Sequence, residues 1–385
     1  MDSEEKPIYS RTNPFLSSIR QRERLSKEGS KKNTYHLVLD LAGSGIHYNV
    51  GDSIAIYPLN DPHIVTWTLK AMNATGDELV VDKNGESWVL RKFLEHKANI
   101  TEVSRKFITE VHGRQTNPEK KDKLEQLLSE HYKEELKHYL ASHEVWGILE
   151  AHHEVVFSFQ ELCLLLMPLL PRFYSIASAR NVVGEEVHLT IAMLEYETNS
   201  LPRRGVCTHY LCNLAPMHDK VIPVYIQSHH GFTVPEDTNQ AMIMIGPGTG
   251  VAPFRAFMQE REKQEGQGKN WLFFGEWNKA YDFFYEEYWL KLQSEGKLRV
   301  DAAFSRDQEY KVYVQDLMWE NGKELYEWLR AGSVFYVCGD AQQMARDVEA
   351  ILLRVFEEFG GMTADEAKAY LKQLRAEKRY LRDVY

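Results

Sequence analysis

The stretch Ala241-Met-Ile-Met-Ile-Gly-Pro-Gly-Thr-Gly-Val-Ala-Pro-Phe-Arg-Ala-Phe-Met-Gln259 decides the fold of this 385-residue sequence. It opens with a continuous apolar run, which is typical of a strand buried in a parallel sheet. Gly246-Pro-Gly-Thr-Gly250 follows directly, and Pro253 suits the first turn of a helix, where no donor is lost. This order predicts a site for nucleotide phosphates, because a helix N-terminus presents N–H donors and a positive dipole end. The turn departs from the usual G-x-G-x-x-G fingerprint, so a purely structural turn is the alternative.

The alternation of apolar strands and helices continues to the end of the chain. Further strands are expected at 270–274, 299–304 and 333–337, and helices at 254–263, 284–292, 314–328 and 342–359. This order predicts a doubly wound parallel α/β domain over residues 233–385.

The earlier part of the chain has a different pattern. Short β segments with glycine and proline between them are expected within 34–57 and at 173–179, 188–196 and 220–227. They predict an antiparallel barrel or sandwich built from residues 1–60 and 166–232. Residues 61–165 form a helical insert in this interpretation. Its apolar stripe within 120–140 consists of Leu124, Leu127, Leu128, Tyr132, Leu136 and Leu140.

Composition and charge exclude several classes of protein. The net charge of −10 argues against a nucleic-acid binder, which needs a basic face. The longest apolar stretch, Leu162 to Leu170, is interrupted by Pro168 and is shorter than the roughly 20 residues that span a bilayer. The first residues are polar and acidic, unlike a secretory signal. Neither the four cysteines nor the histidines have metal-ligand spacing, so we predict no metal, reduced thiols and a cytoplasmic location.

The segment after the expected strand at 299–304 favours NADPH. A site for NADH normally offers an acidic group to the ribose 2′-hydroxyl. Ser305, Arg306, Lys311 and Tyr313 instead offer a hydroxyl, a guanidinium, an ammonium and a phenol, which suit a 2′-phosphate. Alone, these residues could be a solvated surface, but beside the glycine-rich turn they favour NADPH.

The string Arg172-Phe-Tyr-Ser175 places an arginine, an aromatic ring and a hydroxyl where one ligand could contact all three; an ordinary half-exposed strand is the alternative. With Gly205-Val-Cys-Thr208, Gly246 to Arg255 and Cys338-Gly-Asp340, it resembles the FAD- and NADPH-binding half of the diflavin reductases. The resemblance covers about residues 9–385, and within the family the C-terminal run is nearest to the flavoprotein component of sulfite reductase. It implies a ferredoxin-reductase-like antiparallel β-barrel that binds FAD, a helical connecting domain and an NADP-binding α/β domain.

The resemblance also implies roles for particular residues. Arg172 corresponds to the clamp on the FAD pyrophosphate, Tyr174 to the ring stacked on the flavin, and Ser175 to a contact near flavin N5. The other residues implied in FAD binding are Thr101, Ala141, Phe173, Thr190, Ile191, Ala192, Tyr196, Gly205, Val206, Cys207 and Thr208. Those implied in NADPH binding are Gly246, Gly248, Thr249, Gly250, Ser305, Arg306, Lys311, Val312, Tyr313, Val314, Gln315 and Asp347.

A catalytic set is implied in the same way. Ser175, Cys338 and Asp383 correspond to the polar groups around the transferred hydride, and Tyr385 to the C-terminal aromatic that covers the flavin and moves aside for the nicotinamide. Asp383 could stabilise the positive charge that develops on the nicotinamide. A small buried residue at a strand end is the alternative interpretation of Cys338.

Some features depart from the family. No flavodoxin-like FMN domain precedes the barrel; many relatives carry Phe-Arg-Leu-Pro where this chain has Phe232-Thr-Val-Pro235, and end in Trp rather than Tyr. We therefore expect the electrons to pass to a separate acceptor, an FMN protein or the hemoprotein subunit of sulfite reductase. The alternatives are a stand-alone reductase of ferredoxin, flavodoxin or quinone, and a non-enzymatic module that assembles with a hemoprotein.

Overall fold

The computed structural model describes residues 9–229, 231–266 and 268–385. By contacts, the chain forms two compact units. The first unit comprises Met1–Ala55, Phe173–Ala192 and Pro216–Tyr385, and the second comprises Ile56–Arg172 and Met193–Ala215. The three-domain division at residues 60, 166 and 232 stays a prediction.

A parallel five-stranded sheet forms the C-terminal half of the first unit; the parallel α/β arrangement and four of the strands were predicted, whereas the strand at Tyr380–Val384 was not. Its strand order is β16 (Arg299–Phe304), β15 (Asn270–Glu276), β14 (Met242–Ile245), β17 (Val334–Gly339) and β18 (Tyr380–Val384). Every neighbouring pair is parallel. The order therefore reverses beside β14, where the chain leaves one side of the sheet and returns on the other. Ligands of doubly wound proteins bind at such a switch point.

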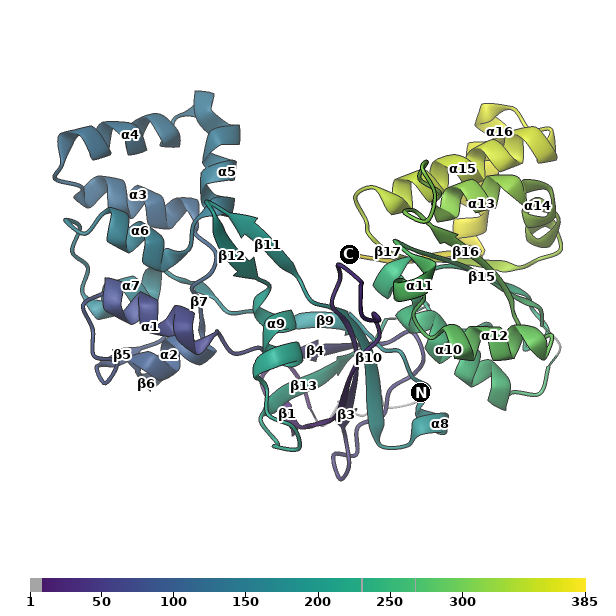
Figure 1. Cartoon of the computed structure of the whole chain (residues 1–385), viewed down its shortest axis with the longest axis horizontal. Coiled ribbons are helices and arrows are strands. Elements are labelled where there is room, and N and C mark those ends of the chain that lie inside the picture. Colours follow the sequence, from purple (N-terminus) through teal and green to yellow (C-terminus); the bar gives the residue numbers. More distant parts are fainter. Residues whose placement is uncertain (1–8, 230, 267) are drawn as a thin grey trace. The chain divides into compact units, whose positions relative to one another are not determined.

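Helices cover both faces of this sheet (Figure 1). α10 (Ala252–Lys263), α11 (Lys279–Asp282) and α12 (Glu286–Ser294) lie on one face, and α13 (Val314–Glu320), α14 (Gly322–Arg330), α15 (Met344–Gly360) and α16 (Ala364–Ala376) lie on the other. Met242 and Met244 pack against the first group, whereas Ile243 and Ile245 pack against the second. Because both faces of β14 are buried, its sequence is apolar at every position.

Two predicted helices differ from those observed. The helix expected at 314–328 is broken at Asn321, which leaves helical geometry with ψ 17° and separates α13 from α14. The helix expected at 284–292 begins at Glu286, because Tyr285 is held in the left-handed region with φ 59°. The break at Asn321 has a local signal, because Asn321-Gly322 is a dipeptide typical of turns, whereas Tyr285 carries no such signal.

Antiparallel strands make up the rest of the first unit. One sheet has the order β1 (Phe15–Ser17), β13 (Ile222–Gln227), β4 (Ser53–Ile56), β9 (Arg172–Ser175), and the other β10 (Glu186–Ala192), β3 (Thr34–Asp40), β2 (Ile19–Arg24). A short helix, α8 (Arg180–Val183), precedes β10. The antiparallel prediction is confirmed, but the expected strands at 48–57 and 173–179 are shorter, covering only β4 and β9.

The second unit is mainly helical. It contains α1 (Pro62–Ala71), α2 (Leu90–His96), α3 (Arg105–Arg114), α4 (Pro118–Leu128), η1 (Glu130–Tyr132), α5 (Lys133–Ser142), α6 (Val145–Ala151), α7 (Phe159–Leu165), α9 (Val206–His209) and η2 (Tyr210–Leu214). Its strands form three two-stranded antiparallel sheets: β5 (Leu79–Val81) with β6 (Ser87–Val89), β7 (Ala98–Asn99) with β8 (Met167–Pro168), and β11 (Glu195–Thr198) with β12 (Leu201–Arg204). Lys120 to Leu140 is helical but not continuous, because Ser129 is extended. Within it, Leu124 and Leu136 are buried.

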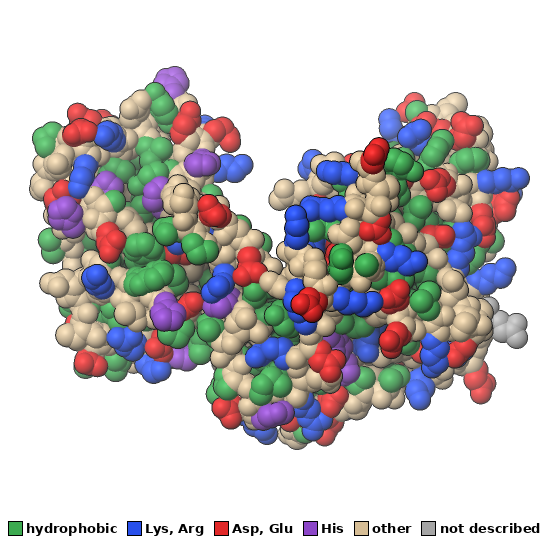
Figure 2. Space-filling view, in the orientation of Figure 1, with side chains coloured by type: hydrophobic (Ala, Val, Ile, Leu, Met, Phe, Trp, Pro, Cys, Tyr) green, Lys and Arg blue, Asp and Glu red, His purple; other side chains and the backbone are tan. Residues whose placement is uncertain are grey.

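Charged side chains of both signs are interspersed on the face seen in Figure 2. Among the described residues, no helix has both the length and the apolar character needed to cross a membrane.

Candidate dinucleotide site

The glycine-rich turn lies between β14 and α10, as predicted. It forms a 3-10 turn, η3 (Gly248–Val251), and Pro253 then occupies the first turn of α10. A Cβ at Gly250 would lie 2.1 Å from the carbonyl oxygen of Cys338, so only glycine allows the turn to pack on β17. Gly248 has φ +58° and faces a hollow, where a Cβ would lie 3.4 Å from Glu276 Oε1. The two glycines therefore serve different purposes: one for packing and one for leaving the hollow open.

The hollow has a volume of about 590 Å³ and lies at the carboxyl ends of β14, β15, β16 and β17. This volume is typical of sites for small molecules. Of the residues predicted to bind NADPH, it is lined by Gly248, Ser305, Arg306, Lys311, Val312, Tyr313, Val314, Gln315 and Asp347. Gly246, Thr249 and Gly250 are in the adjoining turn but do not line it. Sequence reasoning missed Lys32, Glu276, Trp277, Asp340, Gln343 and Met344, which also line it.

The basic residues that line this hollow differ in whether an acidic side chain pairs with them. Lys32 Nζ contacts both carboxylate oxygens of Glu276, at 2.9 and 2.8 Å. Burial raises the pKa of Glu276, and the charge of Lys32 opposes that shift. Arg306 and Lys311 form no ion pair or hydrogen bond through their cationic groups with any residue in the described part of the chain. Two cations at the rim are therefore available to an anionic ligand, as a 2′-phosphate requires.

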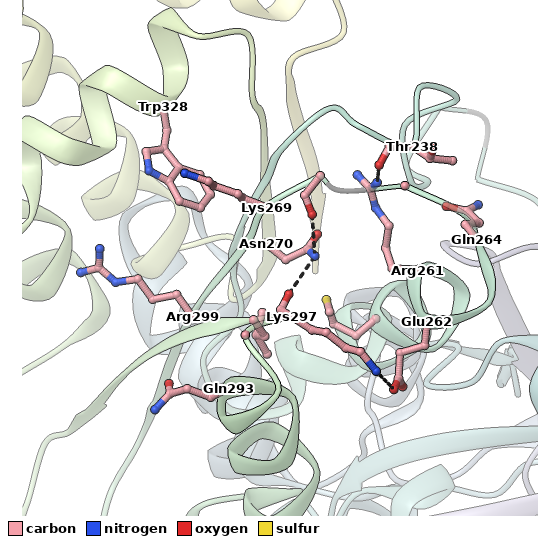
Figure 3. A pocket seen from close by; sticks show the side chains of 15 residues that line it. Thr238, Arg261, Glu262, Gln264, Lys269, Asn270, Gln293, Lys297, Arg299 and Trp328 are labelled. Atoms are coloured by element: carbon pink, nitrogen blue, oxygen red, sulfur yellow. Dashed lines mark hydrogen bonds and ion pairs between the residues drawn. The ribbon is translucent and has the colours of Figure 1, made fainter.

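A second hollow, of about 680 Å³, lies at the opposite edge of the sheet, where Asn270 begins β15 and Arg299 begins β16 (Figure 3). It is also lined by basic residues, and three of them are engaged by the protein itself. Arg261 donates to the carbonyl of Thr238, Lys297 Nζ pairs with Glu262 at 3.5 Å, and Arg299 pairs with Glu324 at 2.6 Å. This hollow is larger than the first, but its lining includes neither the glycine-rich turn nor Arg306 and Lys311.

Ser175, Cys338 and Asp383 come together within the first unit. Ser175 Oγ donates to Asp383 Oδ2 at 2.6 Å, and Cys338 Sγ lies 3.9 Å from the same oxygen. Cys338 and Asp383 are paired across β17 and β18, which sets their separation. Burial raises the pKa of the Cys338 thiol well above its ordinary value, and the neighbouring Asp383 raises it further. Cys338 is therefore a neutral thiol at physiological pH.

The predicted FAD residues of the first unit lie on β9 and β10. Phe173 and Ala192 are exposed, Tyr174 is half-buried, and Ile191 is buried. Thr190 is also buried, and its hydroxyl lies 2.6 Å from that of Tyr285. Its side chain is therefore engaged inside the protein.

The remaining residues predicted to bind FAD lie in the second unit. Arg172 is exposed and lies 3.6 Å from Glu102. Gly205 is the N-cap of α9, which begins at Val206. Thr208 Oγ1 accepts from Leu194 N at 3.2 Å, whereas Thr101 Oγ1 donates to Asn99 at 3.2 Å. Cys207 is buried, and Ala141 and Tyr196 are exposed.

An antiparallel β fold combined with a doubly wound sheet and a glycine-rich turn at its switch point defines the ferredoxin-reductase-like class of dinucleotide-binding proteins. The chain belongs to the FAD binding domain family, which matches residues 7–210. The oxidoreductase NAD-binding domain matches residues 244–350. Together these matches confirm FAD and NAD(P)H as the predicted cofactors.

The chain is also similar to curated proteins along nearly its whole length. It is 40% identical, over 98% of its residues, to the sulfite reductase [NADPH] flavoprotein alpha-component of Bacillus subtilis (strain 168), of which it covers 62%. It is 38% identical, over 98% of its residues, to the proteins of the same name from Aliivibrio fischeri and Vibrio cholerae, covering 61% and 60% of them. The chain therefore spans about three fifths of the length of these relatives.

Proposed function

We propose that this chain oxidises NADPH and passes the electrons through FAD to a separate acceptor, as part of a sulfite reductase system. The observation that carries the proposal is the 2.6 Å hydrogen bond between Ser175 and Asp383, with Cys338 beside them. It joins the serine of the flavin motif on β9 to the C-terminal strand of the nucleotide-binding sheet. The two cofactors would meet where these residues meet.

NADPH is favoured over NADH by the uncommitted charges of Arg306 and Lys311 at the carboxyl edge of the sheet. Ser305 also lines the hollow, and its buried hydroxyl donates to the carbonyl of Glu276 at 3.3 Å. Of the acidic residues in the lining, Glu276 is paired with Lys32, and Asp340 and Asp347 are the other two. A 2′-phosphate would receive charge-assisted hydrogen bonds, each contributing about 1.5–3 kcal/mol. NADH, which carries a hydroxyl at this position, would leave them unmade.

When bound, the nicotinamide supplies a hydride that the flavin can accept. The residues of the chain orient the cofactors and adjust the charge around them. Asp383 would place a negative charge beside the nicotinamide ring, and Ser175 holds the carboxylate in place by donating to it. Cys338, as a neutral thiol, fills the space beneath them without adding a second negative charge.

The acceptor is proposed from the relatives, which are named as flavoprotein alpha-components of sulfite reductase. We propose a hemoprotein subunit of sulfite reductase, reached directly or through an FMN protein, and a cytoplasmic location. A stand-alone reductase of ferredoxin or flavodoxin is the competing proposal.

The test uses the purified chain, reconstituted with FAD. We expect it to reduce ferricyanide with NADPH and at least tenfold less efficiently with NADH, compared by kcat/KM. Absence of NADPH oxidation would refute the enzymatic proposal. The acceptor is then tested by adding, in separate reactions, a siroheme sulfite reductase subunit with and without an FMN flavodoxin, and ferredoxin. Sulfide formation supports the sulfite reductase assignment, whereas reduction of ferredoxin alone supports the competitor.

A further inference from the structure

Trp277 lies just beyond the end of β15, with cations from two other segments against its ring. The guanidinium carbon of Arg306 lies 3.2 Å from the ring centroid, and Lys32 Nζ lies 4.6 Å from it. The backbone N–H of Arg306 also donates to the carbonyl of Trp277 at 2.8 Å. Arg306 is therefore tied to Trp277 by both its main chain and its side chain.

The two cations have different partners. Lys32 is committed to the carboxylate of Glu276, which is only 8% exposed. Within the described ranges, the Arg306 guanidinium has no carboxylate or carbonyl partner, so the Trp277 ring is what holds it. Lys32 is paired with Glu276, and the donors of Arg306 remain available at the rim of the hollow.

A free arginine on a protein surface samples many rotamers, and ordering it on binding weakens affinity. A guanidinium stacked on an indole is held by cation–π attraction while its N–H groups, which lie in the plane of the group, stay available. We propose that Trp277 is a positioning residue for 2′-phosphate recognition: it holds the Arg306 guanidinium ready at the rim before the nucleotide binds. This inference rests on the proposed use of NADPH.

The test measures the binding of 2′,5′-ADP and of adenosine 5′-monophosphate, which lacks the 2′-phosphate, by calorimetry on the FAD-loaded chain. Trp277→Leu should weaken 2′,5′-ADP binding about two- to fivefold, the effect expected from losing one exposed cation–π contact, and leave the monophosphate unchanged. Trp277→Phe, which keeps an aromatic face, should restore most of the loss. With NADPH and ferricyanide, KM should rise in Trp277→Leu and kcat stay the same.

Two further variants separate positioning from other roles. Trp319→Leu removes another tryptophan stacked on an arginine, Arg354, at 4.3 Å, and should not change either affinity. In an Arg306→Ala background, Trp277→Leu should have no additional effect on 2′,5′-ADP binding, because Trp277 acts through Arg306.

The inference is overturned if Trp277→Leu leaves the ratio of the two affinities unchanged, or if its effect persists in full without Arg306. Another outcome would refute the proposed use of NADPH, and not only the role of Trp277. If the unmodified chain binds 2′,5′-ADP no more tightly than the monophosphate, NADPH specificity fails and the role of Trp277 fails with it.

Discussion

The hydroxyl of Tyr385 lies 3.0 Å from the hydroxyl of Thr249, so the C-terminal residue is hydrogen-bonded to the glycine-rich turn. The backbone of Tyr385 is tied at the same end, donating to Gly339 O and accepting from Ala341 N, both at 3.1 Å. The residue predicted to gate the nicotinamide is thus linked to the turn predicted to bind the pyrophosphate. If the turn binds the nucleotide as predicted, the Thr249 hydroxyl has two competing partners, Tyr385 and the nucleotide.

We expect Tyr385→Phe to strengthen NADP⁺ binding about two- to tenfold. The substitution keeps the ring but breaks the bond to Thr249, whose hydroxyl then becomes available to the nucleotide; a net hydrogen bond contributes about 0.5–1.5 kcal/mol. Calorimetric titration with NADP⁺ measures the change. Tyr326→Phe, which removes a hydroxyl from α14, is the control and should have no effect. Unchanged or weaker binding in Tyr385→Phe would argue against the competition.

Asp383→Asn should slow the reduction of FAD by NADPH about tenfold or more. The amide can still accept from Ser175, but the negative charge that stabilises the developing nicotinamide cation is gone. Anaerobic stopped-flow absorbance follows the flavin directly. Asp365→Asn removes a charge from the exposed start of α16 and serves as the control. An unchanged rate of FAD reduction in Asp383→Asn would remove this residue from the catalytic set.

Gly250→Ala should destabilise the first unit by about 1–3 kcal/mol and weaken nucleotide binding. Its Cβ would lie 2.1 Å from Cys338 O, so the turn or β17 has to shift. Gly113→Ala is the matched control, because Gly113 is in α3 and a Cβ there meets nothing within 4 Å. Alanine at that helical position should stabilise by about 0.5–1 kcal/mol. Urea unfolding and NADP⁺ titration of both variants provide the comparison, and equal effects at the two positions would contradict the packing argument.

The stability of the first unit should fall as the pH drops below about 6.5, in part because of His36. Burial, helped by the charge of Arg255, lowers the pKa of His36 to about 3. The unfolded chain binds this proton more readily than the folded protein, so the contribution of His36 is fully present above pH 6.5 and is lost as the pH falls towards 3.

Between pH 7 and pH 5, the loss from His36 amounts to about 2 kcal/mol. We expect His36→Gln to reduce the pH dependence of the urea midpoint by a corresponding amount, because glutamine does not titrate. His131→Gln, at an exposed position, is the control. If His36→Gln and the unmodified chain lose stability in parallel over this range, His36 is not the group that responds.

Local sequence was enough to predict the parallel sheet and its nucleotide edge. The strand at 299–304 was predicted with its observed bounds, and the turn at 246–250 was placed between a buried strand and a helix, because both signals come from neighbouring residues. Ser305, Arg306, Lys311 and Asp347 do line the hollow at that edge. The break at Asn321 was missed although Asn321-Gly322 is a turn signal, and the break at Tyr285 was missed because no local stop signal marks it.

The order of residues along the chain was sufficient to predict the chemical groups and most of the strands and helices that carry them. Only the tertiary structure decided which groups meet. Lys32 lies 244 positions from Glu276 in the chain and Ser175 lies 208 from Asp383, yet each pair is in contact. Periodicity and turn signals report interactions between residues a few positions apart, whereas these contacts depend on how strands far apart in the chain align across a packed core. The contact between Trp277 and Arg306 likewise depends on the ends of β15 and β16 lying side by side.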